Sequence, residues 1–154
     1  MNSIVYLLCG LPGSGKTTYA KNLEKEGITR LTLDETLFER FGREYTDGHK
    51  EKQKQTKDEL KELVVKRVKT GQSVIVDFGF WRKAERNAYK SLIESLGGEW
   101  RLLYFKVGKD VLIERLASRN VTDPQDNHII DEALLEKFIT EFEEPINEGE
   151  EVIG

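Results

Sequence analysis

The chain has 154 residues, a length that fits one domain and buries a core without disulfides or metal ions. Apolar residues make up 38% of it and charged residues 34%, which excludes collagen, low-complexity disorder and a disulfide-rich scaffold. The formal net charge of −4 argues against a non-specific nucleic-acid binder, because such proteins are usually basic.

The longest apolar run, Ile4–Cys9, is followed by glycine and predicts a buried central strand. It is too short to cross a membrane, which takes about twenty residues. No positive residue precedes it, as one would in a signal peptide, so we expect no targeting or membrane segment. Cys9 is the single cysteine and can form no internal disulfide, which favours a reducing, cytoplasmic setting. The sequence gives no indication of the oligomeric state.

Predicted strands and helices alternate along the chain, which is typical of an α/β fold with a parallel sheet and helices on both faces. In the first half we expect strands at 3–9 and 29–33, helices at 16–26, 35–41 and 50–70, and a loop at 43–48. In the second half we expect strands at 73–76 and 101–107, helices at 82–96, 110–118 and 131–142, and a polar loop at 119–130. Asp131 is the expected N-cap of the last helix, and Glu151–Ile153 is expected to be either a short edge strand or a frayed end.

The long helix expected at Lys50–Thr70 carries eight basic and four acidic residues, so it is positive within an acidic chain. Its apolar residues have helical spacing, and its first half is almost wholly polar. A solvated face explains this pattern, and the alternative is a surface that faces phosphates.

Residues Gly10–Thr17 match the phosphate-binding pattern G-x-x-x-x-G-K-[ST] in full, between a predicted strand and a predicted helix. A glycine-rich turn there lets backbone N–H groups and the helix N-terminus point at phosphates. Lys16 is expected to reach the β- and γ-phosphates of ATP, and the Thr17 hydroxyl to ligate Mg²⁺. An incidental glycine-rich turn is the alternative, and the dinucleotide fingerprint is not met because Thr18 replaces its third glycine. The residues expected to bind the nucleotide are Gly10, Leu11, Pro12, Gly13, Ser14, Gly15, Lys16, Thr17 and Thr18.

Two aspartates follow predicted strands, and in open α/β sheets ligands bind outside the carboxyl ends of the strands. Asp77 follows Val74–Val76 and is expected to hold Mg²⁺ directly or through water, with a helix-cap or turn role as the alternative. Asp34 follows the second strand and is expected to accept the proton of an acceptor hydroxyl. Its competing role is the N-cap of the helix that starts at Glu35.

Arg115 and Arg119 are four residues apart, so they project from one face of a predicted helix beside the polar loop. Arginines near a phosphate loop can close on the transferring phosphate and offset its charge, which makes both residues catalytic candidates. The alternative is surface pairing with Glu114 or Asp123.

Three aromatic residues, Phe78, Phe80 and Trp81, come directly after Asp77. Aromatic side chains at the carboxyl edge of the sheet could wall a pocket for the ring or sugar of an acceptor, beside Asp34. Packing under the next helix is an equal alternative.

Together these residues resemble the small P-loop kinases of the polynucleotide kinase, zeta-toxin and chloramphenicol phosphotransferase group, and most closely the short predicted kinases labelled AAA-type ATP-binding proteins. Gly10–Thr18 resembles their G-x-P-G-S-G-K-[ST]-T signature, and the resemblance spans residues 3–120. It implies a P-loop NTPase three-layer sandwich with strand order 2-3-1-4 and room for a fifth strand. It also implies one kinase-like domain over residues 1–154, with a lid segment at 115–130.

The resemblance also implies roles for single residues. Asp34 falls where phage polynucleotide kinase has its proposed general base, Asp77 at the third-strand aspartate, and Arg115 and Arg119 at the lid-helix arginines. Polynucleotide kinases have an arginine three residues after the base, where this chain has Leu37, so a nucleic-acid acceptor is not expected.

We therefore predict a cytoplasmic, Mg²⁺-dependent phosphotransferase that moves the γ-phosphate of ATP to a hydroxyl of a small-molecule acceptor. The chain has no N-K-x-D guanine motif, which argues against a GTPase. Two alternatives belong to other classes. The first is an ATP-binding or ATP-hydrolysing switch or toxin-like module, and the second is a nucleic-acid 5′-hydroxyl kinase that uses the basic helix.

Overall fold

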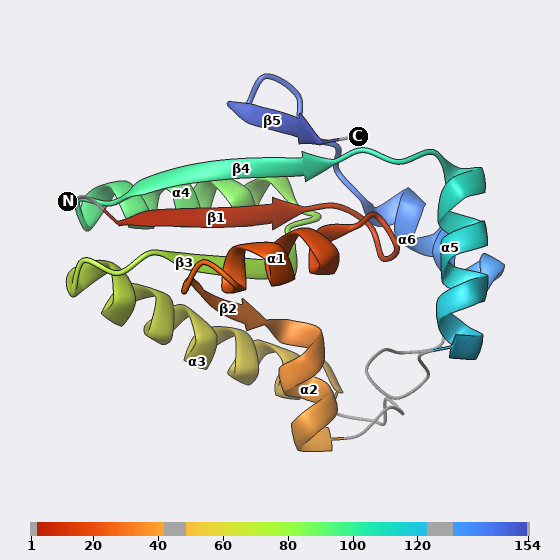
Figure 1. Ribbon diagram of the computed structural model, residues 1–154, viewed down its shortest axis with the longest axis horizontal. Helices are drawn as coiled ribbons and strands as arrows, with labels where there is room; N and C mark the ends of the chain where they lie inside the picture. The colour runs from red at the N-terminus through yellow and green to blue at the C-terminus, as the bar shows by residue number, and fades with distance from the viewer. Residues whose placement is uncertain (1–2, 42–48, 123–130, 154) are drawn as a thin grey trace.

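The computed structural model describes residues 3–41, 49–122 and 131–153. Five strands form one sheet in the order β2-β3-β1-β4-β5, and every neighbouring pair is parallel (Figure 1). The predicted α/β class, the 2-3-1-4 order and the fifth strand are thereby confirmed. The strands are β1 (Ile4–Cys9), β2 (Thr29–Thr32), β3 (Val74–Gly79), β4 (Glu99–Phe105) and β5 (Glu150–Ile153).

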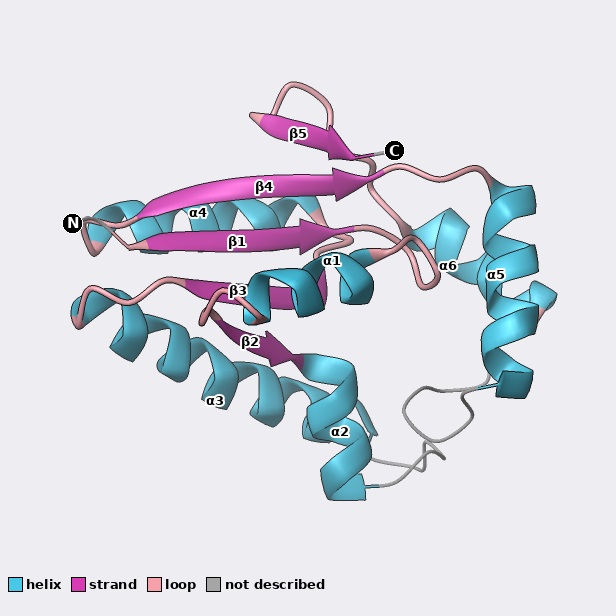
Figure 2. Cartoon of the chain, viewed as in Figure 1, coloured by secondary structure: helices cyan, strands magenta, loops and turns pink. Residues whose placement is uncertain are grey.

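Helices cover both faces of the sheet and its carboxyl edge (Figure 2). The helices are α1 (Lys16–Glu24), α2 (Leu33–Phe41), α3 (His49–Lys69), α4 (Lys83–Ser95), α5 (Lys109–Thr122) and α6 (Glu132–Glu141). One face of the sheet packs against α1 and the other against α3 and α4, while α5 and α6 share a separate apolar cluster. Within the described ranges, no helix has the length and apolar character needed to cross a membrane.

The central strand β1 is buried on both faces, as its uninterrupted apolar sequence predicts. Leu7 and Cys9 pack toward α3 and α4, whereas Leu8 packs toward α1, because successive side chains of a strand point to opposite faces. Cys9 is level with Gly79 of β3 and with Tyr104 of β4. The carboxyl ends of these three strands therefore meet at one edge, where the loop after β1 begins.

Several boundaries differ from the sequence expectations. β3 continues through Asp77 to Gly79, because its pairing with β1 and β2 extends past the apolar run. α2 begins at Leu33, directly after β2, so Asp34 lies in the first turn and the N-cap alternative is wrong. α5 continues to Thr122, so the polar loop starts later than expected.

The C-terminal elements follow the sequence more closely. The side chain of Asp131 accepts a hydrogen bond from the backbone N–H of Leu134 at 2.8 Å, which confirms it as the N-cap of α6. Glu150–Ile153 forms the edge strand β5 and pairs with β4. The lid proposed for 115–130 remains a prediction, because residues 123–130 lie outside the described ranges.

A buried ion pair ties the segment before β5 to α4. Arg86 is fully buried, and its Nε and Nη2 donate to the two carboxylate oxygens of Glu148 at 2.8 and 2.9 Å. Lys90 Nζ donates to the backbone carbonyl of Glu148 at 2.6 Å. The hydrogen bonds from Arg86 hold the pKa of Glu148 below its usual value. Because the pair is shielded from water, removing one partner leaves an uncompensated buried charge.

Replacing Glu148 by alanine is expected to lower the free energy of unfolding by about 3–5 kcal/mol, because Arg86 would stay buried without its partner. The matched control is Glu151→Ala. Glu151 pairs with Arg101 at the surface, and its loss should lower the free energy of unfolding by no more than about 1 kcal/mol. Chemical denaturation at pH 7 measures both losses, and equal losses would contradict the account.

The same pair makes a prediction about pH. The pKa of Glu148 is lower in the folded protein than the ordinary value of 4.5, so its contribution to stability is complete above that pH. It is lost as the pH falls through the lower folded value. The difference between the wild type and Glu148→Ala should therefore shrink in acid, and denaturation curves recorded across that pH range measure it.

Candidate active site

Residues 10–15 form a tight loop between β1 and α1 at the carboxyl edge of the sheet (Figure 1). Gly15 precedes α1 with a φ of 100°, a left-handed conformation that residues with a side chain rarely adopt. The first amides of a helix have no partner within the helix, and together with the helix dipole they favour an anion at this end. The G-x-x-x-x-G-K-[ST] pattern thus lies in the strand–loop–helix context that phosphate binding uses.

The ammonium of Lys16 lies over the loop. Its Nζ donates to the carbonyl oxygen of Gly10 at 3.0 Å and to that of Leu11 at 3.1 Å. A phosphate in the loop would compete with these two carbonyls for the ammonium. The positive charge that a phosphate needs is therefore already beside the loop.

Two further side chains donate to carbonyl oxygens of the loop from distant parts of the chain. Arg115 of α5 donates through Nη1 to Gly13 at 3.2 Å, across 102 residues of sequence. Trp81, in the turn after β3, donates through Nε1 to Gly10 at 3.2 Å, across 71 residues. Leu11 also packs against the apolar cluster of α5 and α6. The loop is thereby held by elements on both sides of β1.

The two predicted lid arginines differ in what the structure describes. Arg115 is exposed and contacts the phosphate loop. Arg119 lies one turn further along α5, and its side chain is outside the described part of the structure. The contact of Arg115 brings α5 to the loop, and the role of Arg119 stays a prediction.

Asp77 lies two residues before the end of β3 and is only 7% exposed. Ile75 packs on the α1 side of the sheet, and strand alternation places Asp77 on that same side. Nη1 of Arg30, from β2, lies 3.7 Å from Oδ2 of Asp77. The cap alternative fails, because α4 starts at Lys83, six residues later.

Arg30 is a residue that the sequence analysis missed. Its side chain is 9% exposed and is paired with Glu24 at 2.9 Å and with Glu35 at 2.8 Å. Its Nη1 is buried without a hydrogen bond to any described residue and faces Asp77. The parallel register, in which Arg30 is level with Ile75, places it there, and no local pattern signals the contact.

Asp34 lies at the same edge of the sheet as Asp77. Thr32, the last residue of β2, is level with Asp77, and Asp34 follows it in the first turn of α2. The side chain of Asp34 lies outside the described part of the structure, and its role as a base stays a prediction.

The three aromatic residues after Asp77 have different positions. Phe80 is fully buried, and Phe78 stacks on it with ring centroids 5.8 Å apart, both against Tyr89 of α4. Phe80 therefore belongs to the core, and the prediction that it walls an acceptor pocket is wrong. Phe78 also packs against core clusters. Only Trp81 reaches the loop, and its ring packs on Phe138 of α6 with centroids 4.8 Å apart.

Thr17 and Asp77 supply the hydroxyl and carboxylate oxygens that Mg²⁺ prefers. Thr17 is exposed at the second position of α1, and Asp77 is at the strand end on the α1 side. Among the described residues, no group of three or more His, Cys, Asp or Glu side chains could hold a metal. These donors fit a Mg²⁺ ion whose other ligands are phosphate oxygens and water.

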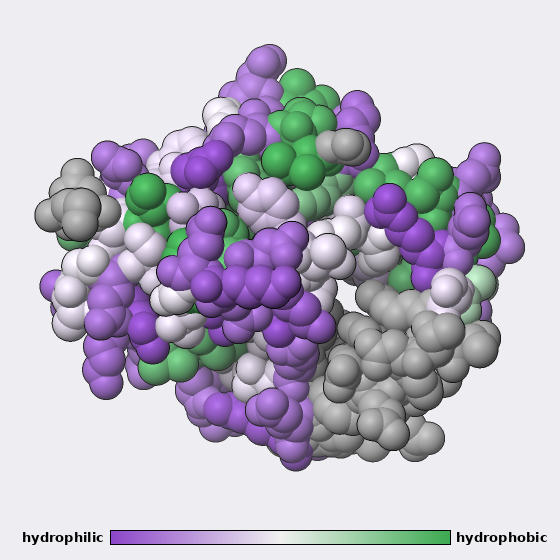
Figure 3. Space-filling view, in the orientation of Figure 1, coloured by the Kyte–Doolittle hydropathy of each residue, from purple (hydrophilic) through white to green (hydrophobic). Residues whose placement is uncertain are grey.

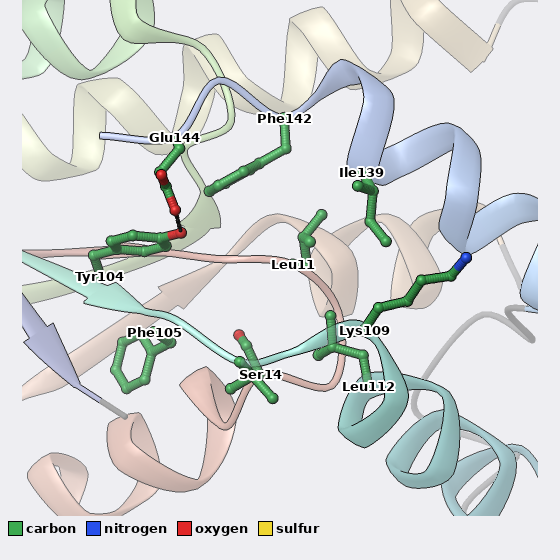
Figure 4. A pocket seen from close by; sticks show the side chains of 10 residues that line it. Leu11, Ser14, Tyr104, Phe105, Lys109, Leu112, Ile139, Phe142 and Glu144 are labelled. Carbon is green, nitrogen blue, oxygen red and sulfur yellow. Dashed lines mark hydrogen bonds between the residues drawn. The ribbon is translucent and has the colours of Figure 1, made fainter. Parts of the chain in front are cut away.

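A cavity of about 290 Å³ flanks the loop on the side of β4 and α6 (Figure 4). Leu11 and Ile139 contribute to its mostly apolar wall, and the Tyr104 hydroxyl donates to Glu144 at 2.5 Å within it. Figure 3 shows that the face of the molecule with α1 in front is mostly hydrophilic. Asp77 lies beyond β1, on β3, so the cavity and this aspartate are on opposite sides of the loop.

Cys9 has no nucleophilic role in this site. Burial raises the pKa of its thiol to about 12, and its Sγ donates to the carbonyl oxygen of Phe80 at 3.4 Å. The thiol stays protonated at neutral pH, and a nucleophilic cysteine acts as the thiolate. The single cysteine is therefore a core residue.

Comparison with known proteins places the chain in a family. A family model described as an AAA domain matches residues 5–145. An adenylate kinase from Thermosipho melanesiensis is 29% identical over 131 residues, which cover 77% of this chain and 60% of that protein. The chain thus spans about three fifths of the length of this curated relative.

Solved structures with the same fold include several kinases. A "putative kinase" from Chloroflexus aurantiacus has a TM-score of 0.78 at 20% identity, over 99% of this chain and 87% of that one. A chain of the Pnkp1/Rnl/Hen1 RNA repair complex has a TM-score of 0.73 at 18% identity, over 91% of this chain and 44% of that one. A gluconokinase from Sinorhizobium meliloti has a TM-score of 0.60 at 20% identity, over 96% of this chain and 78% of that one. The chain therefore belongs to the AAA domain family, and its fold is that of a small P-loop kinase.

Proposed function

We propose that the protein is an ATP-dependent phosphotransferase that moves the γ-phosphate of ATP to a hydroxyl of a small molecule. One observation carries the proposal: three separate elements bring Lys16, Arg115 and Asp77 to the edge of the sheet where the phosphate loop lies. A cationic pair beside the loop and a carboxylate at the strand end are the groups that phosphoryl transfer needs.

In this proposal the loop amides and the N-terminus of α1 hold the phosphates of ATP. Lys16 exchanges its two carbonyl contacts for phosphate oxygens, and Arg115, which is exposed, turns from Gly13 toward the transferred group. Both side chains then offset the negative charge that the transition state spreads over the phosphoryl oxygens. In this proposal Lys16 and Arg115 promote the transfer through their positions and their charges.

Thr17 and Asp77 are the residues that would hold Mg²⁺, which neutralises phosphate charge when bound. Arg30 would keep the Asp77 carboxylate in place from the β2 side, through the 3.7 Å approach of its Nη1. Asp34, in the first turn of α2, would orient the acceptor hydroxyl and take its proton. The acceptor would thus approach from the side of β2 and β3.

Two observations support a small-molecule acceptor over a nucleic acid. The net charge is −4, whereas proteins that bind nucleic acids are usually basic. The likeness to an adenylate kinase supports the same class, while the structural neighbours include both a gluconokinase and a chain of an RNA repair complex.

Transfer of γ-labelled phosphate from ATP–Mg²⁺ to a panel of acceptors tests the proposal. The panel holds sugars, nucleosides, nucleoside monophosphates, small alcohols and a 5′-hydroxyl oligonucleotide. A labelled small-molecule product supports the proposal and names the acceptor class. Label on the oligonucleotide alone would move the assignment to the nucleic-acid kinase. Label released only as free phosphate would favour the alternative of an ATP-hydrolysing switch.

Replacing Asp34 by asparagine is expected to lower kcat about 10²-fold, because the acceptor hydroxyl would lose its base. The affinity for ATP should stay close to that of the wild type, because Asp34 is on β2's side of the site and not in the phosphate loop. Steady-state kinetics with the acceptor found above, together with calorimetric titration of ATP, separate the two effects. Asp58→Asn, an exposed change on α3, is the control. Unchanged transfer in Asp34→Asn would remove the base assignment.

Replacing Arg115 by glutamine is expected to lower kcat by about 10²-fold, the usual scale for loss of one charge-stabilising donor. The melting temperature should not change, because the side chain is exposed. Arg101→Gln is the matched control, since Arg101 is an exposed arginine paired with Glu151 away from the loop. If the two variants transfer phosphate equally fast, Arg115 has no part in the reaction.

A further inference from the structure

We propose that Trp81 is a positioning residue of the phosphate loop, which keeps the Gly10 carbonyl hydrogen-bonded when Lys16 leaves it for a phosphate. The inference rests on the proposed function only in that a nucleotide binds at this loop. It gives the turn after β3 a role in nucleotide affinity, a role that none of the motif residues fills.

The Gly10 carbonyl has two donors in this structure. Lys16 Nζ donates to it at 3.0 Å and Trp81 Nε1 at 3.2 Å. Gly10 is buried, and a buried carbonyl that loses its last donor is strongly disfavoured. When Lys16 turns to a phosphate, Gly10 loses this donor. With Trp81 in place, that exchange leaves Gly10 satisfied.

The second carbonyl that Lys16 serves is different. Leu11 accepts from Lys16 at 3.1 Å, but it is only partly buried and lines the cavity beside the loop. The same carbonyl also accepts from the backbone N–H of Ser14 at 3.2 Å, so it keeps a protein donor when the ammonium leaves. Gly10 is thus the carbonyl for which the indole donor of Trp81 matters.

The turn that carries Trp81 is held in a strained form. Gly79 has a φ of 83° and Phe80 a φ of 48°, which is unusual for a residue with a side chain. The buried Arg86 donates to the Phe80 carbonyl at 2.7 Å through Nη1, and Cys9 donates to it at 3.4 Å. A Cβ on Gly79 would come within 3.1 Å of Trp81 Nε1, so glycine leaves room for the indole.

The other side of Trp81 is fixed by α6 and the segment after it. The indole packs on Phe138 with centroids 4.8 Å apart, and the backbone N–H of Glu143 donates to the Trp81 carbonyl at 2.8 Å. None of these contacts involves Lys16 or the phosphate-facing side of the loop. The indole N–H is therefore aimed at Gly10 independently of where Lys16 points.

Trp81→Phe removes the indole donor and keeps an aromatic ring against Phe138. We expect ATP and ADP to bind about tenfold more weakly to this variant, the scale of one hydrogen bond. The control is Trp100→Phe, because the Trp100 indole donates to Glu94 on the surface. Its nucleotide affinities should equal those of the wild type. Calorimetric titrations give the affinities, and thermal melts verify that both variants are folded.

A second readout separates positioning from a structural role. The chain has two tryptophans, so a ¹⁵N spectrum has two indole N–H signals, which the two variants assign. On addition of ATP–Mg²⁺ to the wild type, the Trp81 signal should shift and stay protected from solvent exchange, whereas the Trp100 signal should not move. The proposal is overturned if Trp81→Phe binds ATP as the wild type does, or if the Trp81 indole becomes unprotected when ATP binds. If the wild type binds neither ATP nor ADP, the proposed function fails first and this inference fails with it.

Discussion

A loop that points its amides at a phosphate must turn its carbonyl oxygens the other way, and those oxygens need donors of their own. In this chain Gly10, Leu11 and Gly13 present such carbonyls, and three side chains serve them: Lys16, Trp81 and Arg115. One donor lies within the motif, one follows β3 and one lies on α5. Much of the carboxyl edge can be understood as the means of bringing these donors to the loop.

The sheet order sets the layout of the site. β1 lies between β3 and β4, so the phosphate loop has the aspartates of the β2–β3 side on one flank and the apolar cavity of the β4 side on the other. The buried pair of Arg86 and Glu148 also supports the site. The guanidinium of Arg86 that pairs with Glu148 donates to the Phe80 carbonyl as well, and so holds the turn that carries Trp81. Core stability and loop geometry therefore depend on one side chain.

Local patterns predicted the parts of the site that are local in sequence. The strand, loop and first helix around Lys16 follow from one motif, and the strand order follows from the resemblance that motif carries. Contacts across 71 and 62 residues, those of Trp81 with Gly10 and Arg86 with Glu148, have no local signal. The predicted end of β3 at Val76 is also wrong, because pairing with the neighbouring strands extends β3 to Gly79, beyond its apolar run. These contacts and this strand end depend on strand register and on packing between distant segments, and neither can be read from a single sequence.

The central claim is that backbone amides of the loop and of the start of α1 bind the phosphates of ATP. Hydrogen exchange of those amides, with and without ATP–Mg²⁺, tests it most directly. We predict that the amides of residues 13–18 exchange more slowly when ATP–Mg²⁺ is present and do not change with adenosine, which has no phosphates. Protection that is absent from this loop, or that adenosine produces equally well, would contradict the account.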